Sequence, residues 1–152
     1  MNKPNDHIWK FQTSLSRHLL FWSIFSIFGG LILHIPRSRL ANGIGIQFTV
    51  WGLIDAIIAI FGERAAKKRF AQLPDPMADE IADRESHKLY KILLVNTGLD
   101  IGYMLGGSAL SLTKGKSDPG WRGHGIGIII QGVFLFIFDL VHMLLIGRKI
   151  QN

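Results

Sequence analysis

Cysteine is absent from the sequence. Disulfide bonds, thiolate metal sites and thiol redox chemistry are therefore excluded. The Gly-x-Ser-x-Gly motif of serine hydrolases and the His-Glu-x-x-His motif of zinc proteases are absent as well. We therefore expect a protein that is not an enzyme.

Charged residues are almost missing from four long apolar stretches, which cover residues 19–35, 44–61, 92–112 and 126–146. Each stretch is near the roughly 20 residues that an α-helix needs to cross a bilayer. A soluble helical core would show polar residues every third or fourth position, whereas whole turns pass here without one. The pattern predicts an all-α, integral membrane four-helix bundle, a single four-span domain over residues 1–152. A soluble bundle with a buried core is the alternative.

The net charge of +6 is gathered beside the apolar stretches. Basic residues that flank membrane spans set their orientation, with the richer side in the cytoplasm. We therefore expect the lipid bilayer as partner, no nucleic acid, and a multi-pass protein of the cytoplasmic (inner) membrane with both termini inside. The richer side carries Lys3, Lys10, Arg17, Arg64, Lys67, Lys68, Arg69, Arg84, Lys88, Lys91, Arg148 and Lys149, and the other side carries Arg37, Arg39, Lys114, Lys116 and Arg122.

The connection 63–91 reads as two charged cytoplasmic helices, separated by Pro74 and Pro76. Asp75 is a suitable N-cap for the second helix, with Pro76 at its first position. We expect the charges of both helices to form a solvated face. Trp9, near the start of the chain, is expected at the level of the lipid headgroups.

A faint internal repeat relates the first half of the chain to the second. A shift of 80 positions places Gly43, Gly45, Ile46 and Gly52 on Gly123, Gly125, Ile126 and Gly132, and a shift of 77 places Ile24, Gly29, Gly30 and Leu33 on Ile101, Gly106, Gly107 and Leu110. Two parallel two-helix repeats would produce this pattern. Chance matching between glycine-rich apolar segments is the alternative.

Three aspartates, Asp55, Asp100 and Asp139, lie inside the apolar stretches, where a charge costs about 2.5–3.5 kcal/mol on insertion scales. At about 100° per residue, each shares a helix face with other polar or aromatic groups. Because lipid cannot solvate these faces, we expect them to meet inside the bundle. The faces consist of Gln47, Trp51 and Asp55; of Asn96, Asp100 and Tyr103; and of Gln131, Asp139 and His142.

This polar set predicts a buried site that binds or conducts a cation or a proton. Its oxygen and imidazole groups would also suit a metal ion, although no cofactor is required. One alternative is a non-catalytic accessory or structural subunit of a larger membrane complex, in which the polar groups only hold the bundle together. Another is a di-haem electron-transfer protein, with His34 and His124 at one end and His18 and His142 at the other. The expected site residues are Asp55, Asn96, Asp100, Tyr103, Gln131, Asp139 and His142.

Gly98, Gly102 and Gly106 form a small-residue stripe on the third apolar stretch. Such stripes let helix backbones approach closely in membranes. We expect helix packing there, either within the chain against Ser26 and Gly30 or between two copies in a homodimer.

One motif stands in each of the second, third and fourth apolar stretches: Trp51-Gly52-x-x-Asp55, Asn96-x3-Asp100-x-x-Tyr103, and Gln131-Gly132-x6-Asp139-x-x-His142. Together they resemble a family of small four-span prokaryotic integral membrane proteins without an assigned function. The resemblance covers nearly the whole chain. It implies a membrane location and four spans, and it carries over no activity.

Overall fold

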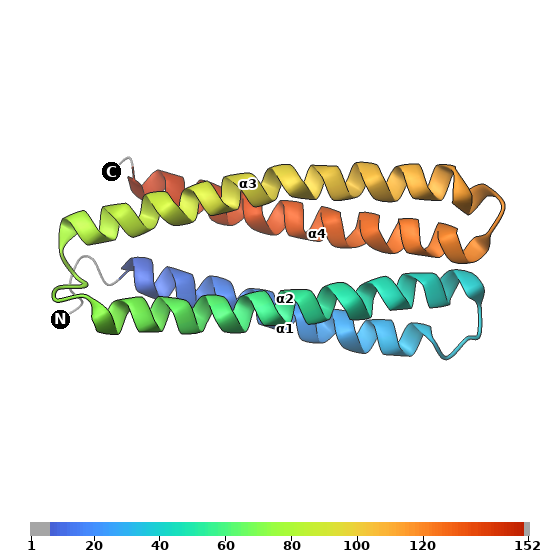
Figure 1. Cartoon of the computed structure of the whole chain (residues 1–152), viewed down its shortest axis with the longest axis horizontal. Helices are drawn as coiled ribbons and strands as arrows, with labels where there is room; N and C mark the ends of the chain where they lie inside the picture. Colours follow the sequence, from blue (N-terminus) through green and yellow to red (C-terminus); the bar gives the residue numbers. More distant parts are fainter. Residues whose placement is uncertain (1–6, 151–152) are drawn as a thin grey trace.

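Four long α-helices run antiparallel and side by side in the computed structural model, which describes residues 7–150 (Figure 1). They are α1 (His7–Leu33), α2 (Arg39–Gln72), α3 (Asp79–Leu112) and α4 (Pro119–Ile150), with a short 3-10 helix η1 (Lys114–Lys116) before α4. The expected all-α four-helix bundle is confirmed. Lys3 and the outermost parts of the expected domain, 1–6 and 151–152, lie outside the described residues.

The helices pair as two hairpins, α1 with α2 and α3 with α4, and α2 packs against α4 to join them. One end of the bundle, here named the terminal end, holds the start of α1, the α2–α3 connection and the end of α4 (Figure 1). The opposite end, named the loop end, holds the two hairpin turns. There, Ser38 caps α2 by accepting a hydrogen bond from the backbone N–H of Ala41 at 3.4 Å.

The α2–α3 connection is longer than the sequence suggests. α2 continues unbroken to Gln72, and α3 begins only at Asp79. The expected N-cap at Asp75 is wrong, because its carboxylate accepts from the backbone N–H of Met77 at 3.1 Å and holds a turn instead. Aspartate stabilises such turns with the same oxygen that it would use as a cap.

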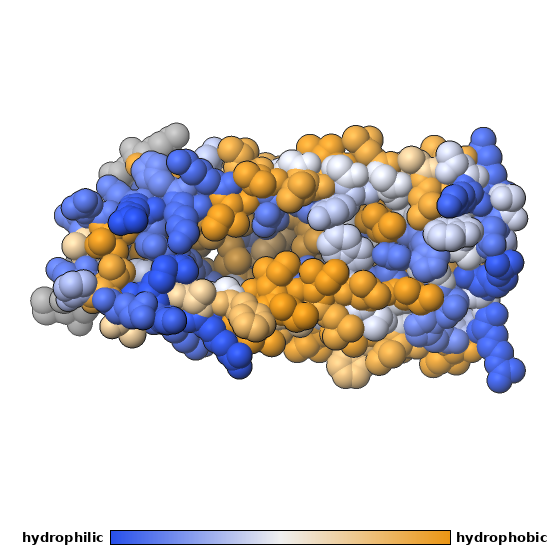
Figure 2. All heavy atoms as spheres, in the orientation of Figure 1, coloured by the Kyte–Doolittle hydropathy of each residue, from blue (hydrophilic) through white to orange (hydrophobic). Residues whose placement is uncertain are grey.

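Many polar side chains lie in the interior of the bundle, and many large apolar side chains lie on its surface. The largest fully buried side chains include Gln131, Asp55, Ser23 and Ser26, whereas many large apolar side chains are exposed. Hydrophobic residues gather over the middle of the visible face, and hydrophilic residues lie at both ends (Figure 2). A soluble bundle would show the reverse arrangement, so this distribution favours a membrane protein over the soluble alternative.

Within residues 7–150, three helices are long and apolar enough to cross a membrane: α1, α2 and α4. α3 is as long as α2 but begins with charged turns and carries Asn96 and Asp100 farther on. The expected span at 92–112 therefore stays a prediction.

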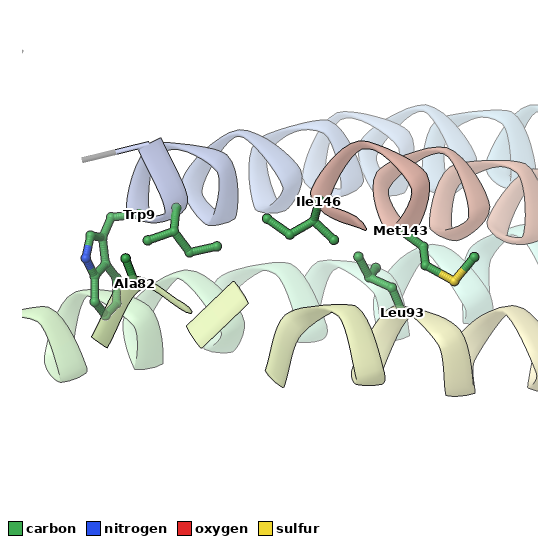
Figure 3. Packing of buried hydrophobic residues seen from close by; sticks show 6 residues of the cluster. Trp9, Ala82, Leu93, Met143 and Ile146 are labelled. Carbon is green, nitrogen blue, oxygen red and sulfur yellow. The ribbon is translucent and has the colours of Figure 1, made fainter. Parts of the chain in front are cut away.

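An apolar core does form at the terminal end, where Ile8, Leu93, Met143 and Ile146 pack together from three helices (Figure 3). Trp9 joins this cluster and donates its indole N–H to the carbonyl oxygen of Pro76 at 3.0 Å. Trp9 is therefore buried within the chain, and its expected level at the lipid headgroups stays a prediction. The short α2–α3 connection folds back over α1 and supplies the acceptor that buries the indole.

Within each hairpin, the two helices pack against each other at an equivalent glycine. A Cβ on Gly52 of α2 would lie 2.9 Å from the carbonyl oxygen of Ser23 in α1. A Cβ on Gly132 of α4 would lie 3.3 Å from the carbonyl oxygen of Asp100 in α3. The first pair maps onto the second under the shifts of 80 and 77 that relate the two halves of the sequence. The contacts thus repeat along with the residues, which favours two parallel two-helix units.

Candidate functional site

Three carboxyl groups lie inside the bundle, one each from α2, α3 and α4. Asp55 is 2% exposed, Asp100 is 3% exposed and Asp139 is 7% exposed. Gly132 helps to place them, because its missing side chain lets α3 and α4 touch at Asp100. The acidic residues therefore face inward from three separate helices, as the helical spacing predicted.

The three carboxyl groups, here named the carboxyl cluster, are close enough to interact electrostatically. Asp55 is affected by the charge of Asp100, and Asp139 is affected by the charges of both. Asn96 lies beside the side chain of Asp139. One oxygen of Asp55 and one of Asp100 are buried without any hydrogen-bond partner in the described part of the chain. The cluster is thus a concentration of acidic groups with unused hydrogen-bonding capacity.

A crevice of about 230 Å³ leads from the terminal end toward this cluster. All four helices line it, and Figure 2 shows the molecule hollowed between the α1–α2 and α3–α4 pairs. Asn96 and Asp139 lie among its innermost residues, and Arg69, Glu85 and Lys88 lie near the terminal end. Lys88 precedes Asn96 by two turns of helix, about 12 Å, so the charged mouth is well separated from the carboxyl cluster.

The mouth of the crevice is held by a network that the sequence did not reveal. Glu85, only 8% exposed, accepts from Arg69 at 3.2 Å and from Gln12 at 3.4 Å. Arg69 also donates to Gln12 at 3.5 Å, so that α1, α2 and α3 are joined. The expectation of a merely solvated charged face is wrong at Glu85 and Arg69. The sequence carries no clear signal for the burial of these two side chains, because charged residues in a polar segment are ordinarily exposed.

Gln131 is completely buried, but it faces α1 rather than the carboxyl cluster. It accepts from the indole of Trp22 at 3.1 Å and donates to Ser26 at 2.5 Å. The Trp22 ring stacks on Phe134, with centroids 3.5 Å apart. Gln131 is therefore part of a structural link between α1 and α4.

Two further expected site residues lie at other contacts. Tyr103 is partly exposed and meets the edge of Trp51, with ring centroids 4.7 Å apart. The Nδ1 of His142 is 2.7 Å from the carbonyl oxygen of Phe138, and its ring lies 5.9 Å from that of His18. The structure thus brings together Asp55, Asn96, Asp100 and Asp139, and it directs Tyr103, Gln131 and His142 to neighbouring helices. At about 100° per residue, Gln131, Asp139 and His142 span a sector of roughly 80° on α4, which is wide enough to reach two different neighbours.

The glycine stripe on α3 faces outward. A Cβ on Gly98, Gly102 or Gly106 would meet no atom within 4 Å. The expected intrachain packing on α1 is wrong, because Gly30 packs against Gly45 and Ser26 donates to the carbonyl of Phe48 at 2.9 Å. The glycine in α3 that does pack is Gly107, against α4.

The arrangement of the histidines and acidic residues bears on whether the bundle could hold a metal ion or a haem. Among the side chains of residues 7–150, no three His, Asp or Glu are arranged to hold a metal ion. His34 contacts Asn42, and the Nδ1 of His124 lies 3.0 Å from the amide nitrogen of Gln47. Between these histidines α2 and α4 touch backbone to backbone, so no space remains there for a haem. The di-haem interpretation does not fit the loop end.

A family of unknown function, DUF6992, has a sequence model that matches residues 18–140. The match covers all three carboxyl groups and most of the four helices. No curated protein and no solved structure matches the chain. The chain therefore belongs to the DUF6992 family, whose description supplies no activity.

Proposed function

We propose that this member of the DUF6992 family binds and releases protons at the carboxyl cluster, Asp55, Asp100 and Asp139. The observation that carries the proposal is the convergence of three buried carboxyl groups from three helices. Ionised groups at membrane depth cost about 2.5–3.5 kcal/mol each on insertion scales. The described basic side chains of the crevice, such as Arg69 and Lys88, lie toward its mouth. A bound proton is the simplest way to neutralise part of this charge.

The packing of the bundle does not require carboxyl groups at these three positions. Under the shifts that relate the two halves of the chain, Asp55 corresponds to Leu135, Asp100 to Ser23 and Asp139 to Ala59. Leu135, Ser23 and Ala59 are buried too, so uncharged residues fill the same places in the other hairpin. Interhelical hydrogen bonds in membranes contribute about 0.6 kcal/mol on average, less than the insertion cost of one charge. A purely structural role therefore explains the cluster poorly.

Access to the cluster favours exchange with one side of the membrane. The crevice extends from the terminal end into the bundle, whereas Gly43 and Gly123 bring α2 and α4 into backbone contact at the loop end. Basic residues are concentrated at the terminal end, which supports a cytoplasmic orientation. Because α3 runs along α4, a membrane that α4 crosses would also contain residues 92–112. Protons would therefore enter from the cytoplasm of a four-span protein of the inner membrane.

A hydrophobic carbodiimide tests this proposal, because it forms a stable adduct with protonated carboxyl groups in apolar surroundings. The protein in lipid nanodiscs is labelled, digested and mapped by mass spectrometry. We expect an adduct on the carboxyl cluster that is lost in Asp100→Asn or Asp139→Asn and that decreases as the pH is raised. Asp83→Asn, which changes an exposed aspartate, should label like wild type. Labelling of Asp83 while the cluster stays unlabelled at every pH would overturn the proposal.

A second candidate function, an accessory subunit that docks through α3, is supported by the open glycine stripe. Close backbone contact at Gly98, Gly102 and Gly106 would suit another membrane helix. A second copy of the chain is the partner to examine first, by molar mass in detergent with and without Gly102→Ile. An unchanged monomeric mass would reject the homodimer.

A further inference from the structure

A broad groove lies at the terminal end, on the outer side of the α1–α2 hairpin. Its volume is about 830 Å³, and residues of α1 and α2 line it. Trp9 and Phe70 form one wall, with their rings edge to face at 5.3 Å, and the small residue Ala66 leaves room beside them. The groove is distinct from the crevice, because the α1 residues that line the crevice, such as Gln12 and Leu19, lie on the opposite side of that helix.

The groove is strongly basic. Lys10 and Arg17 enter it from α1, and Lys67 enters it from α2. Glu63 lies beside it and pairs with Lys67 at 2.8 Å. Its hydrogen bond from Lys67, together with the charges of Lys67 and Arg17, lowers the pKa of Glu63. Arg17 and Lys67 outnumber Glu63, so these three side chains carry a net positive charge. The Lys67 ammonium has three N–H groups, enough for Glu63 and a second acceptor.

Hydroxyl groups accompany these cations. Thr13 and Ser14 line the groove within one turn of Lys10 and Arg17. Cations, hydroxyls and an aromatic wall in one concave surface suit a phosphate ester better than a carboxylate or a free metal ion.

An apolar stripe continues from the groove along α1. Lys10, Ser14 and Arg17 share one face of the helix with Phe21 and Phe28, at spacings of i, i+4, i+7, i+11 and i+18. Phe21 is 76% exposed and Phe28 is 62% exposed. The face therefore changes along its length from cationic to hydrocarbon-like, as the headgroup and chains of a lipid do.

We infer that this groove binds the phosphate of an anionic phospholipid, with Arg17 and Lys67 at the headgroup and the acyl chains along Phe21 and Phe28. The inference shares the membrane placement with the proposed function but does not involve the carboxyl cluster. A lipid bound here would fix the depth of α1 and α2 in the bilayer.

The test uses the full chain in nanodiscs of mixed phosphatidylglycerol and phosphatidylcholine, with bound lipid counted by native mass spectrometry. The double variant Arg17→Gln, Lys67→Gln removes two groove cations. The control Arg64→Gln, Lys68→Gln removes the same charge from exposed positions of α2 that do not line the groove. Since a basic residue near an anionic surface contributes about a factor of five, we expect phosphatidylglycerol to bind about 25-fold more weakly to the groove variant. The control should bind it as wild type does.

Two results would overturn the inference. One is an equal loss in both double variants, which would indicate diffuse attraction. The other is a wild-type protein that retains phosphatidylcholine as well as phosphatidylglycerol, a measurement that needs no variant to fold. Glycerol 3-phosphate, which has no acyl chains, should not displace the lipid at equal concentration; displacement would assign the groove to a soluble phosphate and also contradict the inference. Circular dichroism confirms that each variant is folded.

Discussion

Gly107 of α3 and Gly125 of α4 pack so closely that a Cβ on Gly107 would lie 2.8 Å from the carbonyl oxygen of Gly125, and the reverse distance is 2.6 Å. The same reciprocal relationship joins Gly30 and Gly45 in the first hairpin, at 2.6 and 2.7 Å. Backbone atoms cannot turn aside as a side chain does, so any substitution must push the helices apart. These two glycine pairs set the spacing of both hairpins.

This packing makes Gly107→Ala destabilising by about 1–3 kcal/mol, the usual cost of an overpacked contact. The matched control is Gly102→Ala on the same helix, where a Cβ meets nothing within 4 Å. That change should stabilise the monomer by up to about 1 kcal/mol through helix propensity. Unfolding by SDS, followed by circular dichroism, measures both. Equal effects of the two substitutions would contradict the glycine contacts.

The link between Gln131, Trp22 and Ser26 predicts a coupling across α1 and α4. Gln131→Ala leaves the Trp22 indole and the Ser26 hydroxyl without their partner, so we expect a loss of about 1–3 kcal/mol. A double-mutant cycle with Ser26→Ala should give a coupling free energy of about 0.6 kcal/mol. Strictly additive effects would show that Gln131 acts on the fold without its bond to Ser26.

The network at the crevice mouth predicts that the stability cost of replacing Arg69 depends on whether Glu85 is still present. Arg69→Leu alone leaves the buried carboxylate of Glu85 without its cation, and should destabilise the protein by about 1.5–3 kcal/mol. Combining it with Glu85→Leu removes the unpaired charge, so the double variant should regain most of the loss. Thermal unfolding in detergent compares them. A double variant less stable than Arg69→Leu would show that the ion pair is not the source of the effect.

Asp118, in the turn before α4, predicts a pH dependence at the loop end. It accepts from the backbone N–H of Gly120 at 2.7 Å and pairs with Arg39 at 2.7 Å, and both interactions lower its pKa. A lowered pKa favours the charged form in the folded protein, so the stabilisation is present above the ordinary aspartate pKa of about 3.9 and is lost as the pH falls through the lowered value. Asp118→Asn should therefore melt below wild type at neutral pH and together with it in acid. A constant difference at all pH values would contradict this origin.

The sequence predicts the burial of the three aspartates because two strong constraints act together. Helical periodicity assigns Asp55, Asp100 and Asp139 to definite faces, and lipid forbids these faces to point outward. The glycine repeat is equally visible, since backbone contact tolerates no larger residue at Gly30, Gly45, Gly107 or Gly125.

Other features could not be predicted because several partners satisfy the same pattern. Periodicity places Gly98, Gly102 and Gly106 on one face but does not say which neighbour that face meets, and the adjacent Gly107 makes the contact instead. Glu85 is one of several acidic residues in a charged segment, and only the tertiary fold brings Gln12 to it from α1. Gln131 and Asp139 differ by about 80° around α4, which is enough for them to face different neighbouring helices.

Infrared spectroscopy of the protein in nanodiscs detects protons bound at the carboxyl cluster, because protonated carboxyl groups absorb in a carbonyl-stretching region separate from that of ionised ones. At neutral pH, where exposed aspartates are ionised, we expect a protonated-carboxyl band in wild type that Asp83→Asn leaves intact. The band should diminish in Asp55→Asn, Asp100→Asn and Asp139→Asn, and disappear in the triple variant. A spectrum without this band, or a band unchanged in the triple variant, would contradict proton binding at the carboxyl cluster.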